Sequence, residues 1–178
     1  MALKPTIYKF NISLSDLDQD YYDTLHLTVA QHPSETHERM MARVLAFCLN
    51  AQQEALVFTK GLSEPDEPDI WARAMDDHLI LWIDVGEPAV ERIKKATRTA
   101  KNVKIYSFNA KSDIWWQQTQ SKFATLPVSI TQFCPDDICA LAKLLTRTMT
   151  CSITITGESA FIATESGECE VSWKNLQH

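Results

Sequence analysis

Glycine is scarce in this sequence, with four residues in 178, and neither a low-complexity stretch nor an internal repeat is present. Flexible linkers are therefore not expected, and a single domain over residues 1–178 is the simplest organisation. No apolar stretch reaches ten residues, so a transmembrane helix is not expected. The segment from Met1 to Phe10 alternates like a strand and includes Lys4 and Lys9, which argues against a secretory signal.

The sequence has no C-x-x-C pair, and its five cysteines are an odd number. A disulfide framework and a structural zinc site are therefore not expected, and the cysteines are interpreted as reduced thiols of a cytoplasmic protein. Hydrophobic residues make up 45% of the chain and charged residues 22%, which is ordinary globular composition. The five cysteines are Cys48, Cys134, Cys139, Cys151 and Cys169.

The net charge is -6, which argues against a protein coated with positive charge for nonspecific DNA binding. The charge is unevenly distributed along the chain. Residues 51–91 contain ten acidic and two basic side chains, a net of -8, whereas residues 92–123 contain eight basic side chains and Asp113, a net of +7. An acidic segment is thus followed directly by a basic one.

Hydrophobic periodicity predicts an α/β fold in which helices flank a mixed β-sheet. A hairpin is expected in residues 1–30, because apolar and polar residues alternate on both sides of an Asp-rich turn. Ser34 is the expected N-cap of a helix that ends near Asn50. The other expected elements are strands at 55–59, 69–75 and 78–85, a helix from Pro88, a strand at 103–108, a helix at 111–123, a strand at 128–133, a helix at 135–148, and antiparallel strands at 151–155, 160–164 and 169–173. The strand at 103–108 is expected to lie parallel to the preceding one, through a right-handed crossover.

The hairpin in residues 69–85 offers two carboxylates to one site. A two-residue turn at Asp76-Asp77 pairs positions whose numbers sum to 153, which places Trp71 opposite Trp82 and Asp69 opposite Asp84. Facing carboxylates repel each other unless a cation or a proton lies between them. Magnesium and manganese prefer such oxygen ligands, so we expect a Mg²⁺ or Mn²⁺ site at Asp69 and Asp84.

The element order in residues 34–108 resembles the core of the PD-(D/E)XK, or restriction-endonuclease-like, superfamily. In that superfamily an aspartate on one strand and a D/E-x-K motif on the next meet at a divalent-metal site. Pro68-Asp69 and Asp84-Val85-Gly86 match these two elements, except that Gly86 replaces the lysine. The resemblance implies a nuclease-like core, with the hairpin in residues 1–30 and the helices and strands in 111–178 added to it.

Three further residues complete the predicted site. Some members of the superfamily recover the lysine's charge from the following helix, and Arg92 and Lys95 share one face of that helix. Glu35, near the start of the first helix, is a further candidate metal ligand. The predicted catalytic residues are therefore Asp69, Asp84, Arg92 and Lys95, and the predicted metal ligands are Asp69, Asp84 and Glu35.

Each of these residues also has an ordinary structural interpretation. Asp69 suits a turn after proline, Glu35 suits the positive end of a helix dipole, and Arg92 and Lys95 suit a solvated helix surface. Asp84 is harder to explain in this way, because it follows an apolar strand in which a lone carboxylate is costly. Trp71 and Trp82 are interpreted as a packing pair instead of a base-stacking platform, and His32 as a loop residue instead of a metal ligand with His37.

Motifs along almost the whole chain are similar to those of the YaeQ family of small Gram-negative bacterial proteins. This resemblance implies a variant of the PD-(D/E)XK nuclease core and does not imply a particular activity. The matching strings are Met1-Ala-Leu-Lys-Pro-Thr-Ile-Tyr, His32-Pro-Ser-Glu-Thr, Glu38-Arg-Met-Met, Asp66-Glu-Pro-Asp-Ile-Trp, Leu81-Trp-Ile-Asp-Val-Gly, Arg92-Ile-Lys-Lys-Ala, Ile114-Trp-Trp-Gln-Gln and Arg147-Thr-Met-Thr.

Two functional hypotheses follow. The first is a metal-dependent nuclease in which Asp69 and Asp84 bind the metal and basic residues approach a phosphate of a nucleic acid. The second is a non-catalytic interaction protein on a degenerate nuclease fold, acting on a protein partner or in transcription or nucleic-acid complexes. Gly86 and the net acidity favour the second hypothesis, and the paired carboxylates favour the first.

Overall fold

The computed structural model describes residues 4–178. Among these residues, no helix is both long and apolar enough to cross a membrane. The helices are α1 (His37–Leu49), a short 3-10 turn (Gly61–Ser63), α2 (Val90–Thr99), α3 (Ser112–Phe123) and α4 (Pro135–Ala142). The strands are β1 (Thr6–Asp16), β2 (Tyr21–Gln31), β3 (Leu56–Phe58), β4 (Ile70–Arg73), β5 (Leu79–Val85), β6 (Ala100–Ser107), β7 (Val128–Phe133), β8 (Thr148–Thr156), β9 (Ser159–Thr164) and β10 (Gly167–Gln177).

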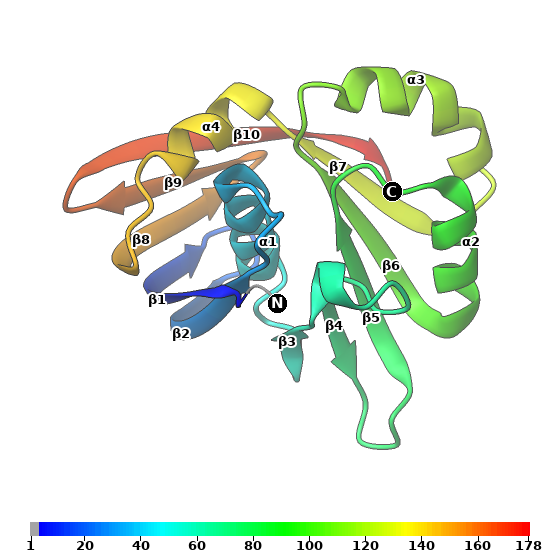
Figure 1. The fold of residues 1–178 in the computed structure, drawn as a ribbon, viewed down its shortest axis with the longest axis horizontal. Coiled ribbons are helices and arrows are strands. Elements are labelled where there is room, and N and C mark those ends of the chain that lie inside the picture. The colour runs from blue at the N-terminus through cyan, green and yellow to red at the C-terminus, as the bar shows by residue number, and fades with distance from the viewer. Residues whose placement is uncertain (1–3) are drawn as a thin grey trace.

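All ten strands belong to one mixed sheet, in the order β2-β1-β8-β9-β10-β7-β6-β5-β4-β3. Strand β10 joins its two halves: Gly167–Ser172 pairs with β9, and Trp173–Gln177 pairs with β7. The sheet curls so strongly that its two edge strands, β2 and β3, both lie near α1 (Figure 1). The result is a large, nearly closed sheet with helices on both of its faces.

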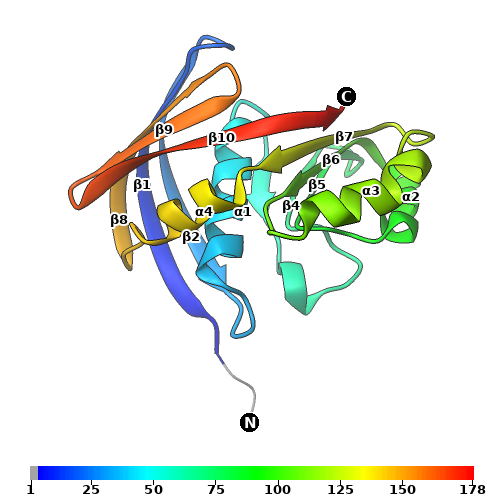
Figure 2. The same ribbon diagram turned by 90° about the horizontal axis from the view of Figure 1, so that it is seen from above.

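Helix α1 fills the inside of the curl, where it contacts both edges of the sheet. Arg43 donates to the carbonyl of Ala30 on β2 at 3.0 Å, and Phe47 stacks on Phe58 of β3 with ring centroids 4.7 Å apart. Helix α4 lies on the same side as α1, whereas α2 and α3 lie on the other side of strands β5 to β7 (Figure 2). Helix α1 therefore packs against one face of the sheet, and α2 covers the opposite face.

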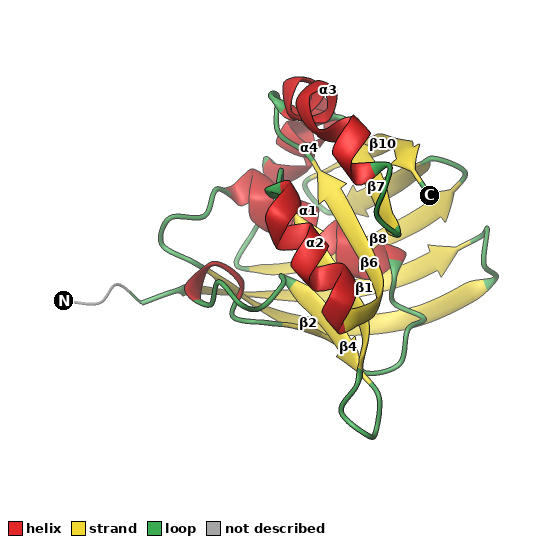
Figure 3. Cartoon of the chain, turned by 90° about the vertical axis from the view of Figure 1, so that its right-hand side faces the viewer, coloured by secondary structure: helices red, strands yellow, loops and turns green. Residues whose placement is uncertain are grey.

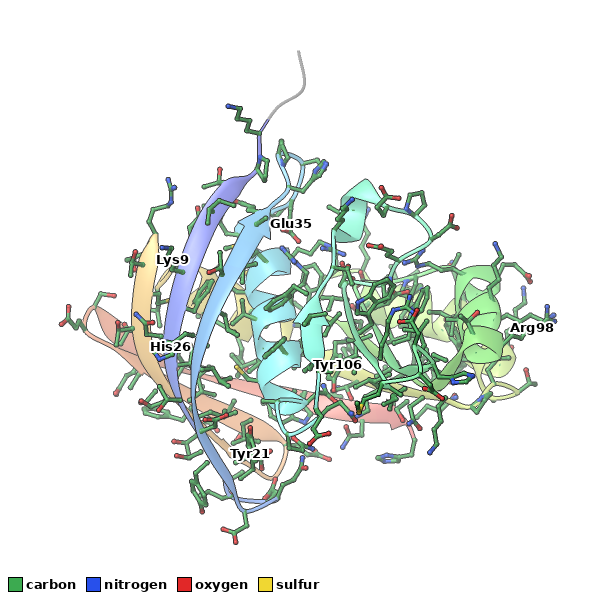
Figure 4. The ribbon with its side chains drawn as sticks, turned by 90° about the horizontal axis from the view of Figure 1, so that it is seen from below. Lys9, Tyr21, His26, Glu35, Arg98 and Tyr106 are labelled. Carbon is green, nitrogen blue, oxygen red and sulfur yellow. The ribbon has the colours of Figure 1, made fainter. Side chains whose placement is uncertain are left out.

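Two hydrophobic cores result from this arrangement. The larger core surrounds α1 and α4, and the smaller one lies between strands β5 to β7 and helices α2 and α3. Helix α2 runs across the outer face of β6 (Figure 3), with Ile93 and Ala96 as its buried residues. Arg98 of α2 points away from the sheet (Figure 4).

The expected N-terminal hairpin is confirmed, with β1 and β2 antiparallel over their whole length. The three C-terminal strands and the parallel pairing of β5 with β6 are also confirmed. Sequence periodicity did not indicate that β1 pairs in parallel with β8. Three helix boundaries were wrong. Thr36, not Ser34, caps α1 by accepting from the N–H of Arg39, and α2 begins at Val90 after its N-cap Ala89, not at Pro88. Helix α4 ends at Ala142, because the chain then turns into β8.

The predicted register of the second hairpin is correct in its middle and wrong at both ends. Its turn has three residues instead of two, because the N–H of Ala74 donates to the carbonyl of His78 and Asp77 adopts a positive φ of 72°. This is a frequent three-residue hairpin geometry. At the other end, the N–H of Asp69 donates to the carbonyl of Ile83, so Asp69 does not lie directly opposite Asp84. The confirmed pairs are Ile70 with Ile83, Trp71 with Trp82 and Ala72 with Leu81.

Phe133 should be among the most costly core residues to truncate, because it is fully buried and packs against Tyr106 and Trp173 at ring distances of 5.4 and 6.0 Å. We expect Phe133→Ala to lower the free energy of unfolding by about 3–5 kcal/mol in urea titrations. Phe161→Ala, on the exposed face of β9, is the control and should cost under about 1 kcal/mol. Equal losses in the two variants would contradict this account of the core.

Candidate metal and phosphate site

Asp69 is a buried carboxylate held at the point where β4 begins. Its Oδ2 accepts a hydrogen bond from the N–H of Val85 at 2.8 Å, and its Oδ1 accepts one from Nη2 of Arg39 at 2.7 Å. Gly61 packs against it so closely that an added Cβ would lie 3.2 Å from Oδ1, and Gly61 has a positive φ of 55°. The backbone of β5 and the 3-10 turn thereby fix this carboxylate.

Asp84 is a second buried carboxylate, near the end of β5. Arg92 of α2 holds it through two hydrogen bonds, from Nε to Oδ2 at 2.8 Å and from Nη2 to Oδ1 at 3.2 Å. Arg92 also donates to the carbonyls of Glu67, at 2.7 Å, and of Pro65. The guanidinium therefore connects α2, β5 and the loop before β4.

The guanidinium of Arg39 is bound by three oxygen atoms from three different residues. Its Nη2 lies 2.7 Å from Oδ1 of Asp69 and 3.2 Å from the carbonyl oxygen of Val85. Its Nη1 lies 2.5 Å from Oε2 of Glu35. Glu35 is buried as well and accepts two further bonds from Arg43, at 2.6 and 2.8 Å.

A cavity of about 500 Å³ opens beside Asp69 and Asp84. Two of the side chains that line it are basic, Arg39 and Arg92, and five are acidic, which gives a formal net charge of -3. A concave site with an excess of negative charge attracts cations and repels phosphate groups. The acidic residues of the lining are Glu64, Glu67, Asp69, Asp84 and Glu87.

Burial raises the pKa of an acid and lowers the pKa of a base, and both effects act in this site. Burial raises the pKa of Asp84, the hydrogen bond and charge of Arg92 oppose this, and the charge of Asp69 raises it further, so the net shift is upward. Burial lowers the pKa of Arg92, but its pairing with Asp84 more than compensates, and the pKa is raised. Burial also lowers the pKa of Arg39, but the charges and hydrogen bonds of Asp69 and Glu35 outweigh this effect, and the pKa is raised. The arginines therefore stay charged while Asp84 remains a poorly solvated carboxylate.

The structure brings three of the five predicted site residues into this cavity, namely Asp69, Asp84 and Arg92. Lys95 lines a neighbouring cavity of about 460 Å³, which it shares with Arg92. Glu35 lies at the N-terminal end of α1, outside the lining of the cavity, and reaches it only through Arg39 (Figure 4). Within residues 4–178, no three His, Cys, Asp or Glu side chains gather as a metal-binding group.

The backbone at Gly86 explains why no lysine stands at this position. Gly86 has a positive φ of 122°, which side-chain-bearing residues rarely adopt, although an added Cβ would meet no atom within 4 Å. Its N–H donates to the carbonyl of Tyr106 at 2.8 Å and continues the pairing with β6. Backbone conformation, and not lack of space, therefore disfavours lysine here.

Arg39, Arg43 and Gly61 are site residues that sequence reasoning missed. A usable signal was present for the arginines, because Glu35, Arg39 and Arg43 are spaced by four and fall on one face of a helix. Arg43 also stands within the apolar run of α1, where a buried cation requires an acidic partner. Gly61 gave no comparable signal, since its contact with Asp69 depends on the tertiary fold.

The fold and the site together define a mixed α/β protein with a nearly closed β-sheet and an acidic, arginine-lined cavity at the end of its second hairpin. The family model described as "YaeQ protein" matches residues 1–173. The chain therefore belongs to the YaeQ family.

Relatives of known name and solved structure support this membership. The chain is 42% identical to "Uncharacterized protein YaeQ" of Escherichia coli (strain K12), with 97% of this chain and 96% of the relative covered, and 42% identical to the protein of the same name in Salmonella typhi, with 96% and 95% covered. The crystal structure of the YaeQ protein from Xanthomonas axonopodis pv. citri has a TM-score of 0.93 at 31% identity, covering 97% of this chain and 98% of that one. The YaeQ protein from Pseudomonas syringae has a TM-score of 0.92 at 32% identity, with 98% and 97% covered.

The raised pKa of Asp84 predicts how stability depends on pH. A folded-state pKa above the unfolded value means that the folded protein binds more protons between the two values, so stability falls as pH rises through that window. Asp84→Asn lacks this titration. Measured by urea unfolding at pH 4.5 and pH 7.5, the stability of the wild type relative to Asp84→Asn should therefore be lower at the higher pH. A difference that stays constant or changes in the opposite direction would show that Asp84 titrates normally.

Glu35 is predicted to contribute strongly to the stability of the fold, because it forms ion pairs with two arginines. Its side chain is 1% exposed and that of Arg43 is 5% exposed, and loss of one partner from a buried ion pair typically costs about 3–5 kcal/mol. We expect Glu35→Gln to lose that much unfolding free energy. Glu38→Gln, at a half-buried position in the first turn of the same helix, should lose less than about 1 kcal/mol. Similar losses in the two variants would mean that the Glu35 network contributes little.

Proposed function

We propose that this chain is a divalent-metal-dependent phosphodiesterase of the nuclease type, built on a variant of the PD-(D/E)XK fold. One observation carries the proposal: Oδ1 of Asp69 and the carbonyl oxygen of Val85 converge on the same cationic nitrogen of Arg39, within a net acidic cavity that also holds Asp84. An oxygen-lined position that already accommodates positive charge is suited to a hard divalent cation.

The arrangement of elements supports the nuclease-fold assignment. Helix α1 is followed by β3, β4 and β5 as neighbouring antiparallel strands, and then by α2 and by β6 in parallel with β5. This order resembles that of the superfamily core. By that resemblance, Asp69, just before β4, and Asp84, near the end of β5, would correspond to the acidic residues of the motif.

The donor set fits Mg²⁺ or Mn²⁺. Magnesium is usually held by one or two carboxylates, with water and substrate phosphates completing its coordination, and each carboxylate oxygen can accept more than one bond. Asp69, Asp84 and the Val85 carbonyl would hold the ion, and Glu35 would act by positioning Arg39. Such an ion activates water and neutralises charge on a phosphate.

The basic residues would bind the substrate. When a cation holds the carboxylates, Arg92 no longer has to neutralise Asp84 and can offer its planar guanidinium to phosphate oxygens. Lys95 lines the adjoining cavity with Arg92, and would contact a neighbouring phosphate of the same strand. Because the cavity has a formal charge of -3 without a cation, phosphate binding there should require the metal.

A specific observation favours a second candidate, a non-catalytic interaction protein of cytoplasmic nucleic-acid or protein complexes. Arg92 engages Asp84 through two hydrogen bonds and is itself anchored on two carbonyls, while Gly86 replaces the motif lysine. An arginine fixed in this way competes with a metal for Asp84. If the competition favours arginine, the cavity is a structural ion-pair site.

Metal-dependent stabilisation separates the two candidates. A ligand that binds only the folded state stabilises it by about 2.7 kcal/mol at a hundred times its Kd, and each kcal/mol raises the melting temperature by about 2–4 °C in a chain of this size. With millimolar MnCl₂ or MgCl₂, we expect the melting temperature of the wild type to rise by several degrees. Asp69→Asn and Asp84→Asn should lose this rise.

Asp77→Asn is the matched control, because Asp77 lies in the exposed turn of the same hairpin. It should keep the metal response. Cleavage of single- and double-stranded DNA and RNA is then assayed with and without the metal, and activity lost in Asp84→Asn but kept in Asp77→Asn supports the nuclease. No metal response and no cleavage of any substrate would overturn it, and steeply salt-dependent nucleic-acid binding without cleavage would support the second candidate.

A further inference from the structure

Lys104 is a partly buried lysine on β6 whose charge has no acidic partner. Its Nζ donates to Oδ1 of Asn50 at 2.7 Å. None of the ion pairs formed by residues 4–178 includes it. By contrast, the buried side chains of Arg43, Glu35 and Asp84 are each paired with an opposite charge.

This lysine lies on the face of the sheet that packs against α1, whereas Asp84 lies on the face that α2 covers. Lys104 alternates with Val103 and Ile105, which belong to the core beneath α2, and its neighbour on the same face, Tyr106, belongs to the core around α1. Asn50 links the two, because its Nδ2 donates to the hydroxyl of Tyr106 at 2.9 Å. Figure 4 shows Tyr106 toward the end of α1 that is remote from Glu35.

Two cavities of about 480 and 240 Å³ adjoin Lys104. The larger contains the side-chain amides of Asn50, Gln52, Gln53 and Asn102, with Glu54 as its single acidic side chain. The smaller contains the hydroxyls of Ser129 and Thr131, the amides of Asn175 and Gln177, and the C-terminal residue His178. Lys104 is thus the one lysine or arginine in the lining of both cavities, and most of the other polar groups there are uncharged hydroxyls and amides.

Capping of α1 does not account for this arrangement. Asn50 is the C-cap of α1, and a cation there is stabilised by the negative end of the helix dipole. That contact uses one of the three N–H donors of the ammonium group. Burial also lowers the pKa of Lys104, so the protein holds this charge at a cost that an anionic partner would remove.

We propose that the two cavities around Lys104 form a binding site for a small anionic ligand, whose carboxylate or phosphate group pairs with Lys104 and whose polar remainder bonds to the surrounding amides and hydroxyls. In small-molecule sites a few placed polar groups, among them a charged residue, fix the orientation of the ligand. The site lies at the C-terminal end of α1, whereas Asp69 is bound by Arg39 near the N-terminal end of that helix. It does not depend on the nuclease proposal.

The test titrates the ¹⁵N-labelled protein with inorganic phosphate and, separately, with acetate, at constant ionic strength set by NaCl. The side-chain amide signals of Asn50 and Asn102 should shift and saturate with at least one anion. A response to phosphate alone assigns a phosphate ligand, a response to acetate alone assigns a carboxylate, and a response to both assigns the shared anion chemistry. No saturable shift with either anion would overturn the proposal.

Two variants assign the response to Lys104. Lys104→Met removes the charge and keeps the length of the side chain, and should weaken binding by at least about tenfold. Lys101→Met changes an exposed lysine of the same strand and should bind as the wild type does, as should Asp84→Asn. Unchanged affinity in Lys104→Met would reject the site, and if that variant does not fold, the wild-type titration decides alone.

Discussion

The pairing of Arg39 with Glu35 and Asp69 is the interaction on which the rest of the acidic cavity depends. Both carboxylates are buried, and a buried charge is tolerated only when an opposite charge and hydrogen bonds replace the lost water. Arg39 supplies the opposite charge and the hydrogen bonds to both carboxylates. Because Glu35 precedes α1 and Asp69 precedes β4, it thereby connects these two elements. The helix inside the curl and the hairpin at its edge are thereby held in one relative position.

The curled sheet makes this pairing geometrically possible. A flat sheet of ten strands would place one edge far from the other, whereas the curl brings β2, β3 and α1 together (Figure 1). Arg43 then reaches the carbonyl of Ala30 on β2 while it holds Glu35. Polar contacts at the two edges and apolar packing around α1 thus stabilise the same closure.

Local signals in the sequence predicted much of the fold and part of the site. Alternation predicted the hairpin of β1 and β2, and the pairing of Trp71 with Trp82, because both are set by neighbours in the sequence. The parallel pairing of Lys9 with Thr148 is invisible to such patterns, since it joins segments far apart in the chain. The proximity of Asp69, Asp84 and Arg92 could be predicted from one hairpin and the helix after it. Helical spacing could pair Arg39 with Glu35, but its contact with Asp69 depends on how α1 packs against that hairpin.

Strand β10 has a consequence for the order in which the protein can be assembled during synthesis. The half-sheet of β3 to β7 and the hairpin of β1 and β2 leave the ribosome well before residues 167–177. Yet only β10 bonds to both β9 and β7. Until it emerges, the strand edges of β7 and β9 that β10 pairs with have unbonded N–H and C=O groups. Such unpaired edges make a nascent chain prone to aggregation and dependent on chaperones.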